Sequence, residues 1–149
     1  MSTFIHGGSG LELDIGGKAH AALSLGDVVQ INPYLAAADD GYSTQAVGAL
    51  NTSASQAALF GVVLGSNGKS TFALGEDILI RMVGVCQVNV QNTASVLNQG
   101  IKLRASNNDV ESAGAGFSGD ASANRVCGVA HTAGTGLQTV FFNGLSTWG

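Results

Sequence analysis

Apolar and polar residues alternate along several stretches of this chain with a period of two. The longest stretch runs from Ile78 to Val90, where every even-numbered position is apolar or Gly, while Arg81, Gln87 and Asn89 lie among the odd-numbered ones. A period of two is typical of a half-buried β-strand, whereas a helix repeats every 3.6 residues. Gly84, in the middle, predicts a bend or bulge that lets one long strand serve two sheets.

Shorter strands are predicted on both sides of this one, at residues 27–31, 59–64, 101–105, 126–130 and 137–142. Lys102 and Arg104 are expected to point outward from their strand. The polar, Gly-rich residues 106–124 predict a long loop, and the Ala-rich residues 35–39 and 54–58 predict short helical turns at most. Because no stretch shows helical periodicity over 12 residues or more, the predicted fold class is all-β.

Three short blocks recur in the same order, which indicates a possible internal duplication. Residues 29–31, 60–63 and 80–84 resemble residues 101–103, 127–130 and 140–144, with offsets of 72, 67 and 60. A connection that is shorter in the second copy would explain the shrinking offset. The alternative is chance, since strands rich in Gly and Val resemble one another.

The first 22 residues are interrupted by Gly, and only residues 11–15 alternate. We interpret residues 1–22 as an N-terminal arm with at most one short strand, followed by one domain at residues 23–149. A Gly-rich start of this kind is usually mobile unless a partner holds it. It also lacks the basic and apolar regions of a secretory signal.

The composition excludes two classes of partner. The chain has 6 Lys and Arg against 10 Asp and Glu, so it lacks the basic surface that binds nucleic acid. No apolar stretch approaches the roughly 20 residues of a membrane-spanning helix. Only 11% of the residues are charged and 22 of the 149 are Gly. Such a low charge suits a protein whose surface is extensively covered by other chains.

Candidate chemistry is sparse. The three His residues lack the spacing of metal ligands, and no metal, cofactor or catalytic site is predicted. Residues 114–119 match G-x-G-x-x-G but neither follow a strand nor precede a helix, as a dinucleotide site requires. Cys86 and Cys127 are expected to be buried thiols, or a disulfide if their strands are neighbours. The enzymatic alternative is a small hydrolase that uses Cys127 or a Ser.

Five segments together resemble the pattern of small bacteriophage head decoration proteins, also called capsid cement proteins: residues 25–31, 60–63, 77–85, 101–103 and 128–130. That pattern consists of a G-D-x-V strand, a G-V-(V/A) strand and a strand that closes on Gly, repeated in a second half. Asn98 and Gln99 stand where the second copy should have Gly and Asp, so the turn there stays open.

The resemblance implies a small β-barrel or β-tulip domain without catalysis. It implies a virion protein that binds the outside of an icosahedral head as a trimer and stabilises the shell. The partners would be the major capsid protein and further copies of the chain. The main alternative is a β-structural protein associated with a phage tail or fibre.

Contact residues are expected in the arm and in exposed turns. Phe4 and Ile5 are the apolar candidates for anchoring the arm to the shell. Tyr34, Tyr42 and Trp148 lie in turn-like or terminal segments, where aromatic residues often anchor interfaces. The alternative is that these three aromatic residues only cover the ends of the barrel.

Overall fold

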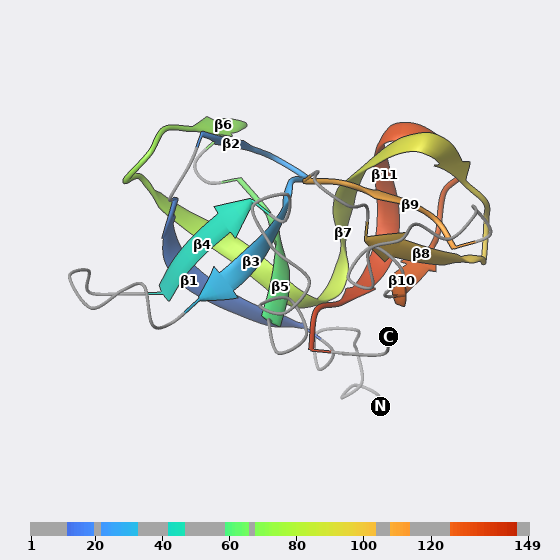
Figure 1. The fold of residues 1–149 in the computed structure, drawn as a ribbon, viewed down its shortest axis with the longest axis horizontal. Coiled ribbons are helices and arrows are strands. Elements are labelled where there is room, and N and C mark those ends of the chain that lie inside the picture. Colours follow the sequence, from blue (N-terminus) through green and yellow to red (C-terminus); the bar gives the residue numbers. More distant parts are fainter. Residues whose placement is uncertain are drawn as a thin grey trace, which may run out of the picture.

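The longest strand, β7 (Asp77–Ser95), runs through the middle of the molecule and belongs to both of its halves (Figure 1). In this computed structural model, its first part pairs with β1 (Leu13–Ala19) and β5 (Leu59–Val63). Its second part pairs with β11 (Gly134–Asn143) and β9 (Val110–Ser112). Gly84 lies between the two parts with φ 134°, a conformation that Gly adopts and other residues avoid. The predicted bend is therefore confirmed.

The structure describes residues 12–19, 22–32, 42–46, 59–65, 68–103, 108–113 and 126–145, with only the main chain given at 30, 32, 42–46, 92 and 93. All regular elements in these ranges are strands, which confirms the all-β class. In this part of the chain, no helix is long and apolar enough to cross a membrane. The Ala-rich residues 35–39 and 54–58 lie outside the described residues.

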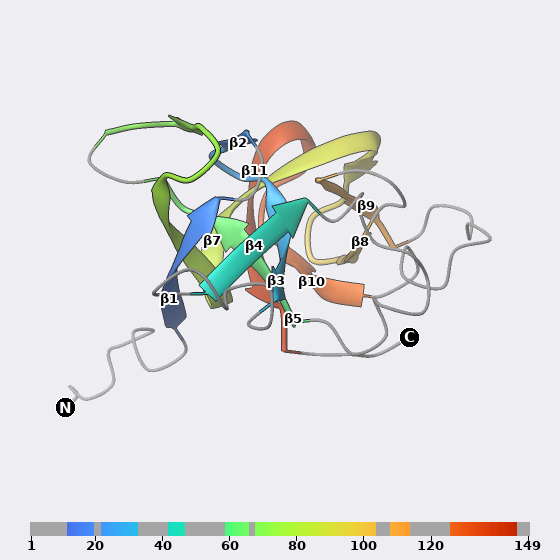
Figure 2. The same ribbon diagram turned by 60° about the vertical axis from the view of Figure 1, so that its left-hand side comes forward.

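Five strands close the first barrel in the order β1, β4 (Tyr42–Ala46), β3 (Val28–Asn32), β5, β7 and back to β1. Figure 2 shows β1, β4 and β3 side by side. β1 and β4 are parallel, and the other neighbours are antiparallel. A separate two-stranded ladder joins β2 (Leu23–Ser24) to β6 (Thr71–Phe72) and adds Leu23 and Phe72 to the barrel core. The other buried core residues are Ala19, Val29, Ile31, Val63, Ile78, Ile80 and Met82.

The second barrel closes in the order β7, β9, β8 (Gly100–Leu103), β10 (Val126–Ala130), β11 and back to β7. Here too one pair, β7 with β9, is parallel and the others are antiparallel. Its core residues from these strands are Cys86, Val88, Val90, Ile101, Leu103, Val110, Cys127, Ala130, Val140 and Phe142. The predicted small β-barrel fold is confirmed, in the form of two barrels that share one strand.

The internal duplication is visible in the strand pairing. Each strand of the first barrel has a counterpart in the second: β3 corresponds to β8, β4 to β9, β5 to β10 and the first part of β7 to β11. In the same way, β1 corresponds to the second part of β7. The offsets of 72, 67 and 60 hold in the ladders, except at a bulge between Val126 and Gly128 in β10. Two examples are Val29–Gly61 with Ile101–Gly128, and Val63–Ile80 with Ala130–Val140. Chance similarity between strands would not preserve both topology and register, so we conclude that the chain contains two copies of one unit.

The turn left open at Asn98 corresponds to the turn at Gly26. Both residues have positive φ, 63° and 85°. The amide of Asn98 donates to the carbonyl of Ala130 at 2.8 Å, as the amide of Gly26 donates to that of Val63 at 2.9 Å. Asn is one of the few residues other than Gly that adopts this conformation readily. The substitution therefore preserves the turn.

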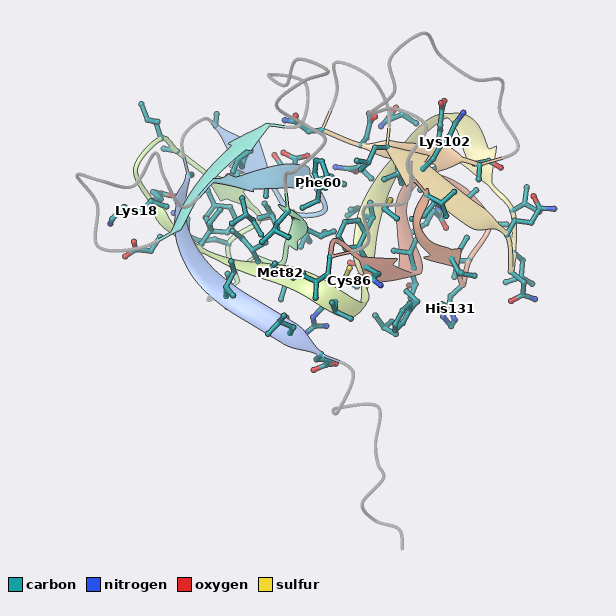
Figure 3. All side chains as sticks on the ribbon, turned by 60° about the horizontal axis from the view of Figure 1, so that its bottom comes forward. Lys18, Phe60, Met82, Cys86, Lys102 and His131 are labelled. Atoms are coloured by element: carbon teal, nitrogen blue, oxygen red, sulfur yellow. The ribbon has the colours of Figure 1, made fainter. Side chains whose placement is uncertain are left out.

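The two barrels are joined by packing as well as by β7. Val28, Phe60 and Val62 lie on the outer face of the first barrel, yet they belong to the core cluster of the second. Phe60 lies between the two halves (Figure 3), and its amide donates to the carbonyl of Gly144 at 3.2 Å. The outer face of β3 and β5 is therefore an interior surface of the molecule.

Three differences from the sequence analysis concern pairing between distant segments. β9 lies inside the predicted loop 106–124 because it pairs with β8 and β7. β1 lies inside the predicted arm 1–22, so the first barrel already begins at Leu13 and not at residue 23. Lys102 is buried rather than outward in solvent, and its Nζ lies 3.7 Å from a carboxylate oxygen of Glu111. Arg104 lies outside the described residues.

Candidate interaction surface

An apolar row crosses the outer face of the second barrel. Val85 on β7 is paired with Phe141 on β11, which is paired with Val129 on β10. Directly paired residues of antiparallel strands place their side chains on the same face. Val85 is 44% exposed, Val129 is 42% exposed and Phe141 is partly exposed. We call these three residues the apolar row.

The duplication explains why this row is exposed. In the first barrel the equivalent row consists of Val62, Arg81 and Asp14, joined by the same pairing. Its Val62 is fully buried, because the second barrel packs against it. Val129 occupies the equivalent position on the second barrel, where it is 42% exposed because no described element packs against it. The apolar row is therefore the counterpart of a surface that the first barrel uses for packing.

A charged cluster lies beside the row, on the other side of the bend. Arg81 donates from Nε and Nη2 to the carboxylate of Asp14, at 2.8 and 2.9 Å. Its Nη1 donates to the carbonyl of Val85 at 2.6 Å. A carboxylate oxygen of Glu12 lies 3.5 Å from Nη2 of Arg81. The hydrogen bonds to Asp14 raise the pKa of Arg81, so the guanidinium stays charged. An apolar centre with a charged rim is the usual anatomy of a protein–protein interface.

Both ends of the described chain lie next to the apolar row. Leu13, at the start of β1, and Asn143, at the end of β11, are both paired with Val83, two residues before Val85. Residues 1–11 and 146–149 therefore join the barrels beside the row. Three side chains are too few for a stable interface, which needs about 20–30 residues a side.

The predicted contact residues fall mostly outside the described residues. This holds for Phe4, Ile5, Tyr34 and Trp148, whose roles stay predictions. Tyr42 begins β4, where only its main chain is described. Sequence reasoning missed the apolar row because its three residues lie on three strands. Their proximity depends on the pairing of residues that are far apart in the chain.

The described residues contain no group of three or more His, Cys, Asp or Glu that could hold a metal ion. Cys86 and Cys127 are both free and buried, and β11 separates their strands, which resolves the open question in favour of thiols. Burial raises the pKa of Cys86 to about 12 and raises that of Cys127 as well. A thiolate nucleophile is therefore disfavoured at both positions. His131 lies exposed at the surface of the second barrel (Figure 3).

No protein-family model matches this chain, and no curated protein matches it in sequence. Among solved structures, the chain is similar to the N base of the head fiber gp8.5 in bacteriophage phi29. The TM-score is 0.50 at 9% sequence identity, over 89% of this chain and 95% of that one. At this identity the likeness concerns the fold, since one fold can carry unrelated functions.

Proposed function

We propose that this chain is a structural, non-enzymatic protein of a bacteriophage head, which binds the outside of the shell and stabilises it. The observation that carries the proposal is the fold shared with a phage head fiber base over most of both chains. The order of short motifs along the sequence, which resembles that of head decoration proteins, supports it independently. The major capsid protein and further copies of the chain, as a trimer, are the proposed partners.

The apolar row is the proposed centre of contact with the shell. Binding there covers Val85, Phe141 and Val129, and the neighbouring cluster of Arg81 with two carboxylates supplies polar contacts at the rim. The arm adds Phe4 and Ile5 from beside the row. Ordering the arm costs conformational entropy, so these apolar contacts must compensate for it.

The proposal is tested on the phage that encodes the chain. Heads from phage with the gene deleted are mixed with the purified chain and pelleted, and the bound protein is quantified. We expect saturable binding and a higher temperature of head disruption. Val129→Asp should reduce binding at least tenfold, whereas Leu79→Asp, a similarly exposed change on the outside of the first barrel, should not. Heads that take up no protein would contradict the proposal.

The second candidate is the base of a fibre that projects from the head, and the description of the phi29 neighbour favours it. The two candidates differ in what gene deletion removes. Loss of projecting fibres with unchanged head stability supports the fibre base. Loss of head stability without loss of fibres supports the cement protein.

A further inference from the structure

The two barrels differ at the end where β5 and β10 leave them. In the first barrel, residues 64–76 connect β5 to β7 and include β6, which pairs with β2. The amide of Leu25, which follows β2, donates to the carbonyl of Ser70 at 2.8 Å. In the second barrel, residues 131–133 alone connect β10 to β11. Within the described residues, the second barrel therefore has no counterpart of β6.

The edge that β6 covers in the first barrel is open in the second. Leu97 and Val96 are the equivalents of Leu25 and Ser24 by the offset of 72, and they are 54% and 46% exposed. Within the described residues, the amide of Leu97 donates to no main-chain acceptor. The main chain of the preceding Ser95 is already paired with Gly134 of β11. The open edge thus begins at Val96. An unpaired edge with apolar side chains is a template for an added strand.

The sequence contains a second copy of the segment that covers this edge in the first barrel. Residues 70–75 read Ser-Thr-Phe-Ala-Leu-Gly, and residues 2–7 read Ser-Thr-Phe-Ile-His-Gly. Ser, Thr, Phe and the final Gly are shared at the same spacing. In the first barrel, this Ser and Thr provide the pairing to Leu25 and Ser24. The N-terminal segment therefore has the residues that the second barrel lacks.

We propose that residues 2–4 of one copy bind as an added strand along Val96 and Leu97 of a neighbouring copy. By analogy with β6, the carbonyl of Ser2 accepts the hydrogen bond of the Leu97 amide, and Thr3 lies opposite Val96. Phe4 then lies on the same face as Leu97 and covers that exposed side chain, so in this arrangement Phe4 contacts the neighbouring copy instead of the shell. The inference rests on the proposed function in one respect, which is that the chain works in several adjacent copies.

The reach of the arm favours a neighbouring copy over the same chain. The arm enters the first barrel at Leu13, which is paired with Val83 near the bend of β7. From Val83 to Val96, β7 extends about 43 Å along its path at 3.3 Å per residue. β7 is curved, so the direct distance is shorter than this path, but the arm has to run around the outside of the second barrel because the core side chains fill its interior. Residues 4–13 span at most about 30–32 Å when fully extended. Figure 1 shows the start of β1 near the bend and the end of β7 on the far side of the second barrel.

Disulfide trapping between two different full-length chains tests the proposal. One chain carries Thr3→Cys and the other, with a tag that changes its mass, carries Val96→Cys. These two positions correspond to Thr71 and Ser24, which are directly paired in the β2–β6 ladder. The native Cys86 and Cys127 are buried and do not compete. After mild oxidation at high protein concentration, we expect a reducible band that contains one chain of each kind.

Two controls make the result specific. Thr3→Cys mixed with Leu74→Cys, which is 71% exposed on the first barrel, should give no such band. Adding Phe4→Asp to the Thr3→Cys chain should reduce trapping at Val96→Cys at least tenfold. Trapping that is absent, or equal for Leu74→Cys, would overturn the proposal. So would a chain with both Thr3→Cys and Val96→Cys that forms only an internal disulfide.

The test separates this inference from the proposed function, since it uses no phage heads. Trapping without head binding would support strand exchange and contradict the head protein. Head binding without trapping would contradict strand exchange alone.

Discussion

The bend at Gly84 is what allows β7 to serve both barrels, and Gly84→Ala tests this role. A φ of 134° lies in a region that residues with a Cβ avoid, and holding such a residue there costs on the order of 1–3 kcal/mol. A Cβ at this position would lie 3.1 Å from Cγ of Glu12 and 3.2 Å from Cδ of Arg81. Both are flexible side chains that can shift, so the backbone strain dominates. We expect a loss of about 2 kcal/mol in the free energy of unfolding.

Urea denaturation followed by fluorescence or circular dichroism measures this loss. With a slope of about 2 kcal/mol per molar urea, the midpoint should fall by about 1 M. Gly16→Ala in β1 is the matched control, because no atom lies within 4 Å of the added Cβ. Its backbone has no positive φ, so the control should be neutral or stabilising by up to about 1 kcal/mol. Equal midpoints for the two variants would refute the reasoning about the bend.

Three further predictions concern the interior. Burial raises the pKa of Asp27 above its ordinary value of 3.8. The contribution of Asp27 to the free energy of unfolding is therefore complete below pH 3.8 and is lost as the pH rises through the raised pKa. Asp27→Asn should therefore gain stability relative to the wild type as the pH increases from about 3 to 7, and a difference that stays constant in urea titrations across this range would contradict the assignment. Cys86 and Cys127 should not react with a thiol reagent in the native protein and should both react after unfolding; a thiol that reacts under native conditions would show that the core is open. Phe60→Ala should cost about 3–5 kcal/mol and leave one cooperative unfolding transition, because Phe60 is shared by both barrels; two separate transitions in calorimetry would show that the barrels fold independently.

The sequence predicted those parts of the fold that depend on local pattern. Period-two alternation located β7 and β8, and Gly84 indicated the bend. The recurring blocks indicated the duplication with the offsets that the ladders retain. The pattern did not predict β9, which has only three residues and is defined by its pairing with β8 and β7. Short strands of this kind carry no periodicity of their own.

The candidate surface was less predictable than the fold, for a physical reason. Val62 and Val129 are equivalent residues that each follow a Gly in a short apolar strand, yet Val62 is fully buried and Val129 is exposed. The difference arises because the second barrel packs against Val62, while no described element packs against Val129. Lys102 shows the converse, since an alternating strand pattern placed it in solvent and the tertiary structure buries it. Exposure of a strand's outer face depends on what packs against it, which local sequence does not encode.

The duplication, together with the differences between its two copies, accounts for both proposed contacts of this chain. Two equivalent barrels joined through β7 bury one outer face, that of Val28, Phe60 and Val62, and leave the equivalent face on the second barrel uncovered. The shorter β10–β11 connection likewise leaves the edge at Val96 uncovered, while β6 covers its counterpart. Each uncovered surface is thus a site whose counterpart already has an intramolecular partner. Under the proposed function, the copy or shell next to the chain would supply the missing partner, which would give a chain with few charged residues two separate means of binding its neighbours.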